Sequence, residues 1–271
     1  MSTFPYVPLD ERPWRLSMGL RPLDHSRWLE VDARRDEELA LKRRLVSEQR
    51  DVVVALRDEG NTACEELRDL VIDNLSTNHP GVSRDVVTNE HPLVQASLMV
   101  QEDLCVLVLD GEWRLAAACV CFPSRWSLAS KIGTTLDAIH EPVPGYHEEL
   151  SRPTNAFFAR LKPDRSFWRL NWTLLNDASL FQPESHRANA VGVPDEWSFR
   201  VERQTLRLLP TSRAAVFTIR TYVASVQQLK NEHADFAEHL LGAIDSAPPA
   251  LKAYKGWVGV AERLRESLSR T

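Results

Sequence analysis

His140 is the residue of this sequence whose type and position best suit chemistry. Apolar residues precede it at helical spacing: Leu128, Ile132, Leu136 and Ile139. We therefore expect a helix over residues 127–140 that ends beside His140, because Pro142 disfavours helix at Glu141. A neutral imidazole at the end of an apolar helix face is what the iron of a haem needs as an axial ligand. A hydrogen-bonded structural histidine fits the same pattern and is the more frequent case.

Charged residues inside otherwise apolar strand-like stretches form a second candidate set: Arg169, Arg200, Glu202 and Arg203. Glu202 beside Arg203 would polarise a bound small molecule or hold a cationic amine. The alternative is that these residues line the solvent face of a half-buried sheet, which is the commoner reason for such a pattern. Strand alternation puts Glu202 and Arg203 on opposite faces, so both point into one pocket only if a bulge intervenes.

Other classes of function are poorly supported by the sequence. It has no Gly-x-Gly-x-x-Gly or Gly-x-x-x-x-Gly-Lys motif, no Gly-x-Ser-x-Gly elbow and no His-Glu-x-x-His pair. The net charge of -5 argues against nucleic acid as the main partner. No apolar run approaches the ~20 residues of a membrane span, and the first residues lack the pattern of a secretory signal. The four cysteines have no Cys-x-x-Cys spacing, so we expect buried free thiols and a cytoplasmic protein.

Strand signals are clear in the middle of the chain. Two apolar runs flank Asp110-Gly111, which predicts a hairpin over residues 104–122. Three further stretches read as strands: residues 167–175, 197–206 and 214–223. Helices are expected at residues 33–59, 148–161, 225–244 and 249–268. A capping box at Thr62 predicts one more helix, which is followed by a loop at 78–91.

This order of elements predicts an α+β protein. Five antiparallel strands with helices inserted after the second match the layout of a PAS domain. We divide the chain into a mostly helical N-terminal extension (1–100), a PAS-like core that would bind haem (101–224) and C-terminal helices (225–271). Fold alone does not give function, so the ligand has to be argued from residues.

Several long motifs resemble one family, the haem-dependent oxidative N-demethylase alpha-subunit family. They are Gln101-Glu-Asp-Leu104, Phe122-Pro-Ser-Arg-Trp126, Lys131-Ile-Gly133, Ile139-His-Glu-Pro-Val-Pro-Gly-Tyr146 and Val201-Glu-Arg-Gln-Thr-Leu206. The resemblance runs from about Trp14 to Lys255. The chain departs from the expected pattern at Leu170, where Arg-Ser-Asn-Trp would be usual, and this leucine puts the shape of the pocket in question.

The resemblance implies a PAS fold that binds haem b and oxidises dimethylamine with O2. It makes His140 the axial ligand, and Glu202 and Arg203 the catalytic residues of the distal pocket. It also implies contacts to the cofactor from Lys131, Tyr146, Arg169 and Asn171. Electrons would come ultimately from NADPH, through reductase partners that carry flavin mononucleotide and an iron–sulfur cluster; tetrahydrofolate also belongs to such a system.

Two other readings remain open at this point. One alternative is a haem PAS sensor of gas or redox state, although no output domain is visible within 271 residues. The other is a family member that has lost the cofactor and acts only in assembly. For the N-demethylase we expect a small amine and O2 as ligands. In none of the three cases do we expect nucleic acid or a membrane as a partner.

Overall fold

A seven-stranded antiparallel sheet organises the molecule. The computed structural model describes residues 4–85, 87–184 and 194–268. The strands are β1 (Arg21–Leu23), β2 (Val54–Leu56), β3 (Asp103–Asp110), β4 (Glu112–Cys119), β5 (Ser166–Leu175), β6 (Ser198–Leu208) and β7 (Ala215–Ser225). They are hydrogen-bonded in the order β1-β5-β6-β7-β3-β4-β2. The α+β class is therefore confirmed.

The number of strands differs from the sequence prediction, which had five. The additional strands β1 and β2 have three residues each and pair with the outer edges of β5 and β4. Three residues are too few to show the alternation by which a strand is recognised. β2 also lies inside the stretch 33–59 that was predicted as one helix, where Val54-Ala-Leu56 suits either structure.

Ten α-helices lie within the described residues. They are α1 (Arg35–Glu48), α2 (Arg50–Val53), α3 (Asn61–Asn78), α4 (Pro92–Ser97), α5 (Leu136–His140), α6 (Ser151–Phe158), α7 (Val226–Glu232), α8 (Phe236–Ser246), α9 (Pro249–Lys255) and α10 (Val260–Leu268). The predicted helices at both ends of the chain are each broken into shorter ones. Gly256 and Gly259 have positive φ values of 71° and 75° and separate α9 from α10. The prediction that Thr62 caps the next helix is wrong, because α3 already begins at Asn61.

The predicted helix over 127–140 is also wrong for most of its length. Leu128–Ser130 forms a short 3-10 turn, and Gly133 then adopts a φ of 76°. The positive φ favours glycine here, since a Cβ would strain this backbone conformation; it would also lie 3.0 Å from Nη1 of Arg57, a flexible side-chain end. Only α5 is α-helical, and Oγ1 of Thr135 caps it by accepting from the backbone N–H of Ala138 at 3.2 Å. The predicted end at His140 is confirmed.

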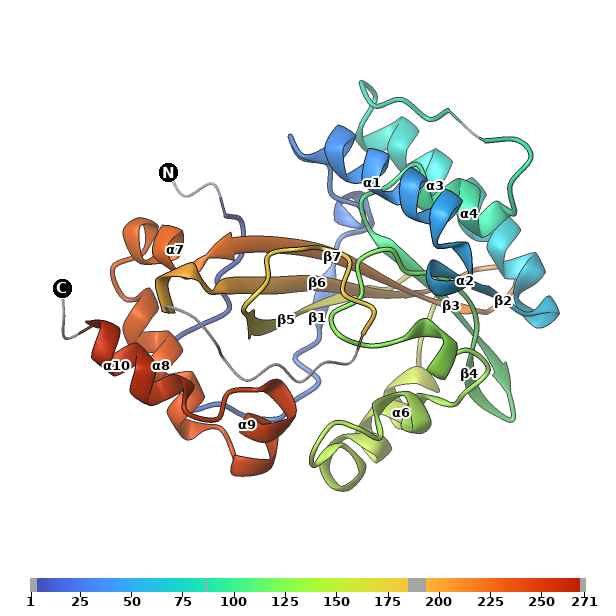
Figure 1. Ribbon diagram of the computed structural model, residues 1–271. Coiled ribbons are helices and arrows are strands. Elements are labelled where there is room, and N and C mark those ends of the chain that lie inside the picture. Colours follow the sequence, from blue (N-terminus) through green and yellow to red (C-terminus); the bar gives the residue numbers. More distant parts are fainter. Residues whose placement is uncertain (1–3, 86, 185–193, 269–271) are drawn as a thin grey trace.

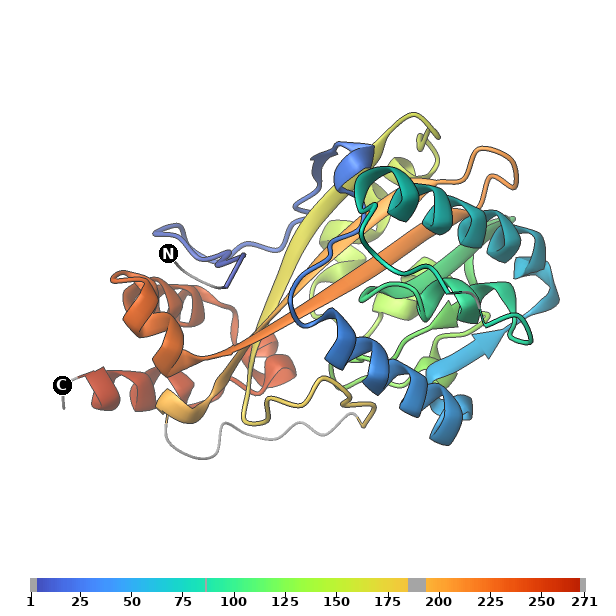
Figure 2. The same cartoon turned by 90° about the horizontal axis from the view of Figure 1, so that it is seen from above.

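The helices form three groups around the sheet (Figure 1). Buried side chains of α1–α4 pack on one face, over β3, β4 and β7. The segment that contains α5 and α6 packs on the other face at the same end. The C-terminal helices α7–α10 pack at the far end of β5, β6 and β7, as the view from above also shows (Figure 2). No helix in the described ranges is long and apolar enough to cross a bilayer.

Buried ion pairs fasten the N-terminal segment to the sheet. Nη1 of Arg220, on β7, lies 2.7 Å from Oε2 of Glu38, and its Nη2 lies 2.6 Å from Oδ2 of Asp32. The hydroxyl of Tyr222 donates to Glu30 at 2.6 Å. Because both Arg220 and Glu38 are almost fully buried, this close pair compensates much of each charge, and Asp32 and Arg34 add to the network.

Candidate functional site

His140 is fixed in one orientation by its own helix. Its Nδ1 lies 2.8 Å from the carbonyl oxygen of Leu136, one turn earlier. A carbonyl only accepts, so Nδ1 carries the proton and Nε2 presents a lone pair. No hydrogen bond to Nε2 is made by the described residues. The ring also stacks on Tyr146, with centroids 4.7 Å apart and planes 15° apart.

The surroundings keep the imidazole neutral. Burial lowers the pKa of His140, while the hydrogen bond to Leu136 opposes this shift. The positive charges of Arg169 and Lys131 lower the pKa further, and the charge of Asp137 acts against them. A histidine has to be neutral to donate an electron pair to a metal. The two cations therefore favour the form of His140 that a metal ion would require.

Lys131 and Arg169 approach this histidine from different elements. Nζ of Lys131 donates to the carbonyl of Ile139 at 2.7 Å, which ties the turn before α5 to its end. Arg169 comes from β5, and its Nε is buried without a hydrogen-bond partner among the described residues. Burial lowers the pKa of Arg169, and the charge of Glu202 partly offsets that effect. This donor is available to a polar group of a ligand, although Nε of Arg35, Arg200, Arg207 and Arg220 is buried in the same way.

Glu202 lies on the same face of the sheet as Arg169. The register pairs Asn171 with Glu202 and Arg169 with Gln204, and paired residues project to one face. Oε2 of Glu202 accepts from the amides of Asn171 at 3.2 Å and Gln204 at 2.9 Å. Oε1 lies 3.7 Å from Nε of Arg200. The carboxylate is thus held in place mainly through one of its two oxygens.

Arg203 does not join this cluster. No bulge interrupts the β5–β6–β7 register, so Arg203 projects to the opposite face from Glu202. Its guanidinium donates to the carbonyls of Trp28 at 3.1 Å and Arg27 at 2.6 Å, and its Nε lies 3.2 Å from Glu30. The expectation that Arg203 shares a pocket with Glu202 is therefore corrected. Arg203 holds the N-terminal segment against the sheet.

Two members of the cluster were missed from the sequence. Gln204 follows Glu202 by two residues, so strand alternation alone would have placed them together. Lys255 comes from α9, and no sequence signal links it to β5. Its Nζ donates to the carbonyl of Trp172 at 2.6 Å and lies 5.1 Å from the ring centroid of Trp257. Burial lowers the pKa of Lys255 to about 8; Glu202 opposes this shift and Arg169 adds to it.

The residues present fit a haem. The donor would be Nε2 of His140, whose ring stacks on Tyr146. The partly buried side chains of Ile132 and Ile139, from the same segment, pack against the apolar core on this face of the sheet. The buried, unpartnered Nε of Arg169 and the ammonium of Lys131 are cations suited to carboxylate groups of such a cofactor.

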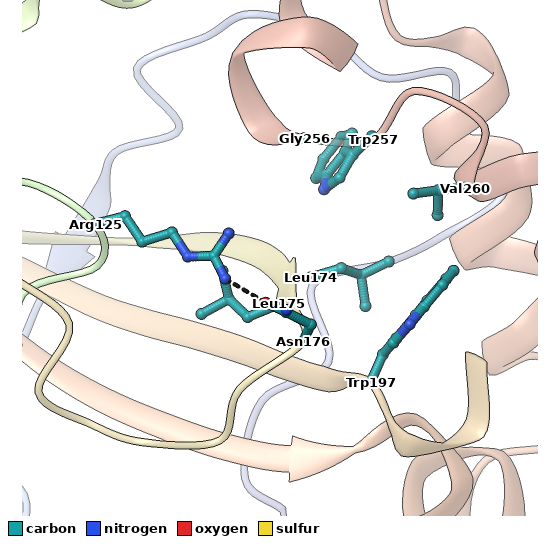
Figure 3. A pocket seen from close by; sticks show the side chains of 8 residues that line it. All are labelled: Arg125, Leu174, Leu175, Asn176, Trp197, Gly256, Trp257 and Val260. Carbon is teal, nitrogen blue, oxygen red and sulfur yellow. Dashed lines mark hydrogen bonds between the residues drawn. The ribbon is translucent and has the colours of Figure 1, made fainter. Parts of the chain in front are cut away.

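A small cavity lies beyond this cluster, where the end of β5 meets the C-terminal helices (Figure 3). Its walls include Leu174, Trp197 and Trp257, and Arg125 donates to Asn176 across one side at 2.6 Å. The volume of about 10 Å³ has room for roughly one water molecule. This cavity belongs to the packing of the C-terminal helices, and it is too small for an organic substrate.

A comparison with protein families gives a match over most of the chain. A family model described as "Haem-dependent oxidative N-demethylase, alpha subunit-like" matches residues 19–265. The match includes α5 with His140, the strands with Arg169 and Glu202, and Lys255 on α9. It is the family that the motifs of the sequence resemble. The chain belongs to the haem-dependent oxidative N-demethylase alpha-subunit-like family.

Proposed function

We propose that this chain binds haem b through Nε2 of His140 and is the catalytic subunit of an oxidative N-demethylase. The substrate would be a small secondary methylamine such as dimethylamine. The observation that carries the proposal is the orientation of His140. Its Nδ1 proton is held by the Leu136 carbonyl, and no described residue hydrogen-bonds its Nε2. Arg169 acts electrostatically on His140, and Glu202 acts in turn on Arg169.

The carboxylate of Glu202 suits a secondary ammonium ion. The amides of Asn171 and Gln204 occupy Oε2, which leaves Oε1 with capacity for a donor from the substrate. A hydrogen bond between an ammonium and a carboxylate is stronger than one between neutral groups. Glu202 would therefore bind and orient the amine, and its Oε1 would take the ammonium proton that has to leave before the nitrogen is oxidised.

Other residues of the cluster would serve the cofactor. Arg169 and Lys131 would pair with its carboxylates, and Tyr146 would hold the ring of His140 by stacking. Asn171 would act indirectly, since its amide fixes Glu202. Haem, when bound, would supply the activation of O2. We leave Arg203 out of the proposed site because of its position on the other face.

The reaction requires electrons from outside this chain. One dimethylamine, one O2, two electrons and two protons give methylamine, formaldehyde and water. The sequence has no dinucleotide fingerprint and no four-cysteine spacing for an iron–sulfur cluster. We therefore propose partner subunits that carry flavin mononucleotide and an iron–sulfur cluster, in keeping with the alpha-subunit-like family.

The five long strands support a PAS-like core. They run in the order β5-β6-β7-β3-β4, and the segment with α5 and α6 is inserted after the second of them along the chain. This segment covers one face of the sheet. We propose that the haem lies between that face and α5, because His140 and Arg169 come from these two elements.

A product assay tests the proposal. Purified protein with saturating haem, O2 and a chemical electron donor is incubated with dimethylamine, and formaldehyde is measured. We expect formaldehyde from dimethylamine and none without haem. Haem binding without formaldehyde from any methylamine would contradict the catalytic proposal and favour a sensor. A protein that remains colourless with haem would contradict both and favour a family member without the cofactor.

A further inference from the structure

A groove on the surface lies between α6 and the start of β5, outside the proposed haem cluster. Its volume is about 460 Å³, within the range of small-molecule sites, roughly 300–1,000 Å³. Phe157 and Phe167 form part of its apolar wall and pack edge to face, with centroids 4.8 Å apart and planes 78° apart. Leu161 and Met18 extend this apolar surface. The groove therefore offers an aromatic and aliphatic floor to a ligand.

Three cations line the same groove. Arg160, Lys162 and Arg165 follow α6 in the connection to β5, and all three are exposed. None of them forms an ion pair with the part of the chain that the structure describes. The acidic residue of this connection, Asp164, acts electrostatically on His25 and does not line the groove. A net positive rim on a protein with a net charge of -5 is a local feature that needs an explanation.

We propose that this groove binds an amphipathic organic anion, with an apolar body against Phe157 and Phe167 and an anionic head at Arg160, Lys162 and Arg165. The concave shape favours a small molecule over an acidic protein, which would meet the cations without filling the apolar floor. The site shares no residue with the cluster of His140, Arg169 and Glu202. It therefore goes beyond the proposed function and does not depend on it.

Calorimetry on the haem-loaded protein tests this site with dodecanoate as the probe. Dodecyltrimethylammonium has the same chain and the opposite charge, and it serves as the ligand control. We expect dodecanoate to bind and the cation to bind at least about tenfold more weakly. The double variant Arg160→Glu/Arg165→Glu should weaken binding of dodecanoate by about tenfold or more, since each reversal replaces an attraction by a repulsion.

The matched control is Arg43→Glu/Arg44→Glu, two charge reversals at exposed positions of α1. It should change the affinity by less than about twofold, because α1 packs on the other face of the sheet and the effect of exposed charges is screened with distance. Thermal melts establish that both variants fold. Equal binding of the two probes, or equal effects of the two double variants, would overturn the proposal.

Haem is itself an amphipathic dianion, so the Soret absorption band is measured on every variant. A band that is retained while binding of dodecanoate is lost supports a separate site. Loss of both in Arg160→Glu/Arg165→Glu would overturn the proposal, because the groove would then hold the carboxylate side of the haem. If the wild type does not bind haem, that result contradicts the proposed function and leaves the groove to be tested separately. Binding of dodecanoate is then measured on the protein without haem.

Discussion

Glu202 has a defined position, and its Oε1 faces Nε of Arg200 at 3.7 Å without a close hydrogen bond, which leaves room for one ammonium ion. Its Oε2 is occupied by the amides of Asn171 and Gln204, and its residue exposure is only 7%. The backbone of β6 and two neighbouring side chains therefore fix the carboxylate before a substrate arrives. Preorganisation of this kind lowers the cost of binding.

The variant Glu202→Gln tests the role of this charge. Glutamine keeps the shape and removes the negative charge, so the amine loses a charge-assisted hydrogen bond of about 1.5–3 kcal/mol. We expect kcat/KM for the amine to fall roughly ten- to hundredfold while the Soret band is unchanged. An amine oxidation rate equal to that of the wild type would exclude Glu202 from substrate binding.

Lys255 gives a prediction about pH. Its pKa is about 8 in the folded protein, because of burial, and about 10.4 in an unfolded chain. Between these values the unfolded state binds more protons, so this residue makes the protein more stable as pH rises from about 8 to 10.4. The Tm of Lys255→Met should lack this contribution. Wild-type and variant curves of Tm against pH that stay parallel would contradict the assignment.

At the scale of the elements, α5 is a single turn that has to present His140. A helix this short has little stability of its own, so its cap and its packing decide whether it forms. The hydroxyl of Thr135 provides that cap, and the glycine at position 133 provides the turn that precedes it. The position of the proposed ligand therefore depends on residues that do not touch it.

Removal of the cap should weaken haem binding indirectly. Thr135→Ala is expected to cost about 1 kcal/mol of stability and to speed the loss of haem to apomyoglobin. Ser225→Ala is a matched control, since Ser225 caps α7 in the same way, by accepting from Gln228 at 3.0 Å. It should cost similar stability and leave haem loss unchanged. Equal haem loss in the two variants would show that α5 has no special role.

The parts of the fold that the sequence predicted are those with a local signal. The hairpin at Asp110-Gly111, the three long strands and the end of α5 at His140 follow from alternation and from Pro142. The breaks inside the predicted helices, and the strands β1 and β2, depend on tertiary contacts such as the hydrogen bond from the Gly133 N–H to the carbonyl of Leu115 at 2.7 Å. At the site, strand alternation correctly predicted that Glu202 and Arg203 lie on opposite faces of the sheet. The position of Lys255 near Glu202 and Arg169 results from the packing of α9, for which the sequence has no signal.

At the scale of the whole molecule, buried charges connect the N-terminal segment to the centre of the sheet. Arg220 holds Asp32 and Glu38, while Arg203 holds Glu30 and two backbone carbonyls. These contacts occupy the face of the sheet opposite Glu202. The two faces therefore have different tasks: ion pairs fasten the chain on one, and the proposed chemistry takes place on the other.

Breaking the Arg220 network should be costly. Arg220→Met leaves buried Glu38 with Arg34, 3.4 Å away and 44% exposed, as its remaining charged partner, and the loss is expected to cost about 3 kcal/mol in urea unfolding. Arg265→Met removes an exposed ion pair with Asp245 and should cost no more than about 1 kcal/mol. A cost for Arg220→Met as small as that for Arg265→Met would show that this network does not stabilise the fold.

The absorption spectrum of the haem-loaded protein tests the central claim most directly. His79→Ala is the matched control for His140→Ala, because His79 is also half-buried at a helix end, with Nε2 3.2 Å from the carbonyl of Leu29. We predict a Soret band in the wild type and in His79→Ala, its loss in folded His140→Ala, and its return when imidazole is added. A wild-type protein that stays colourless in saturating haem, or a His140→Ala variant with an unchanged spectrum, would contradict the account.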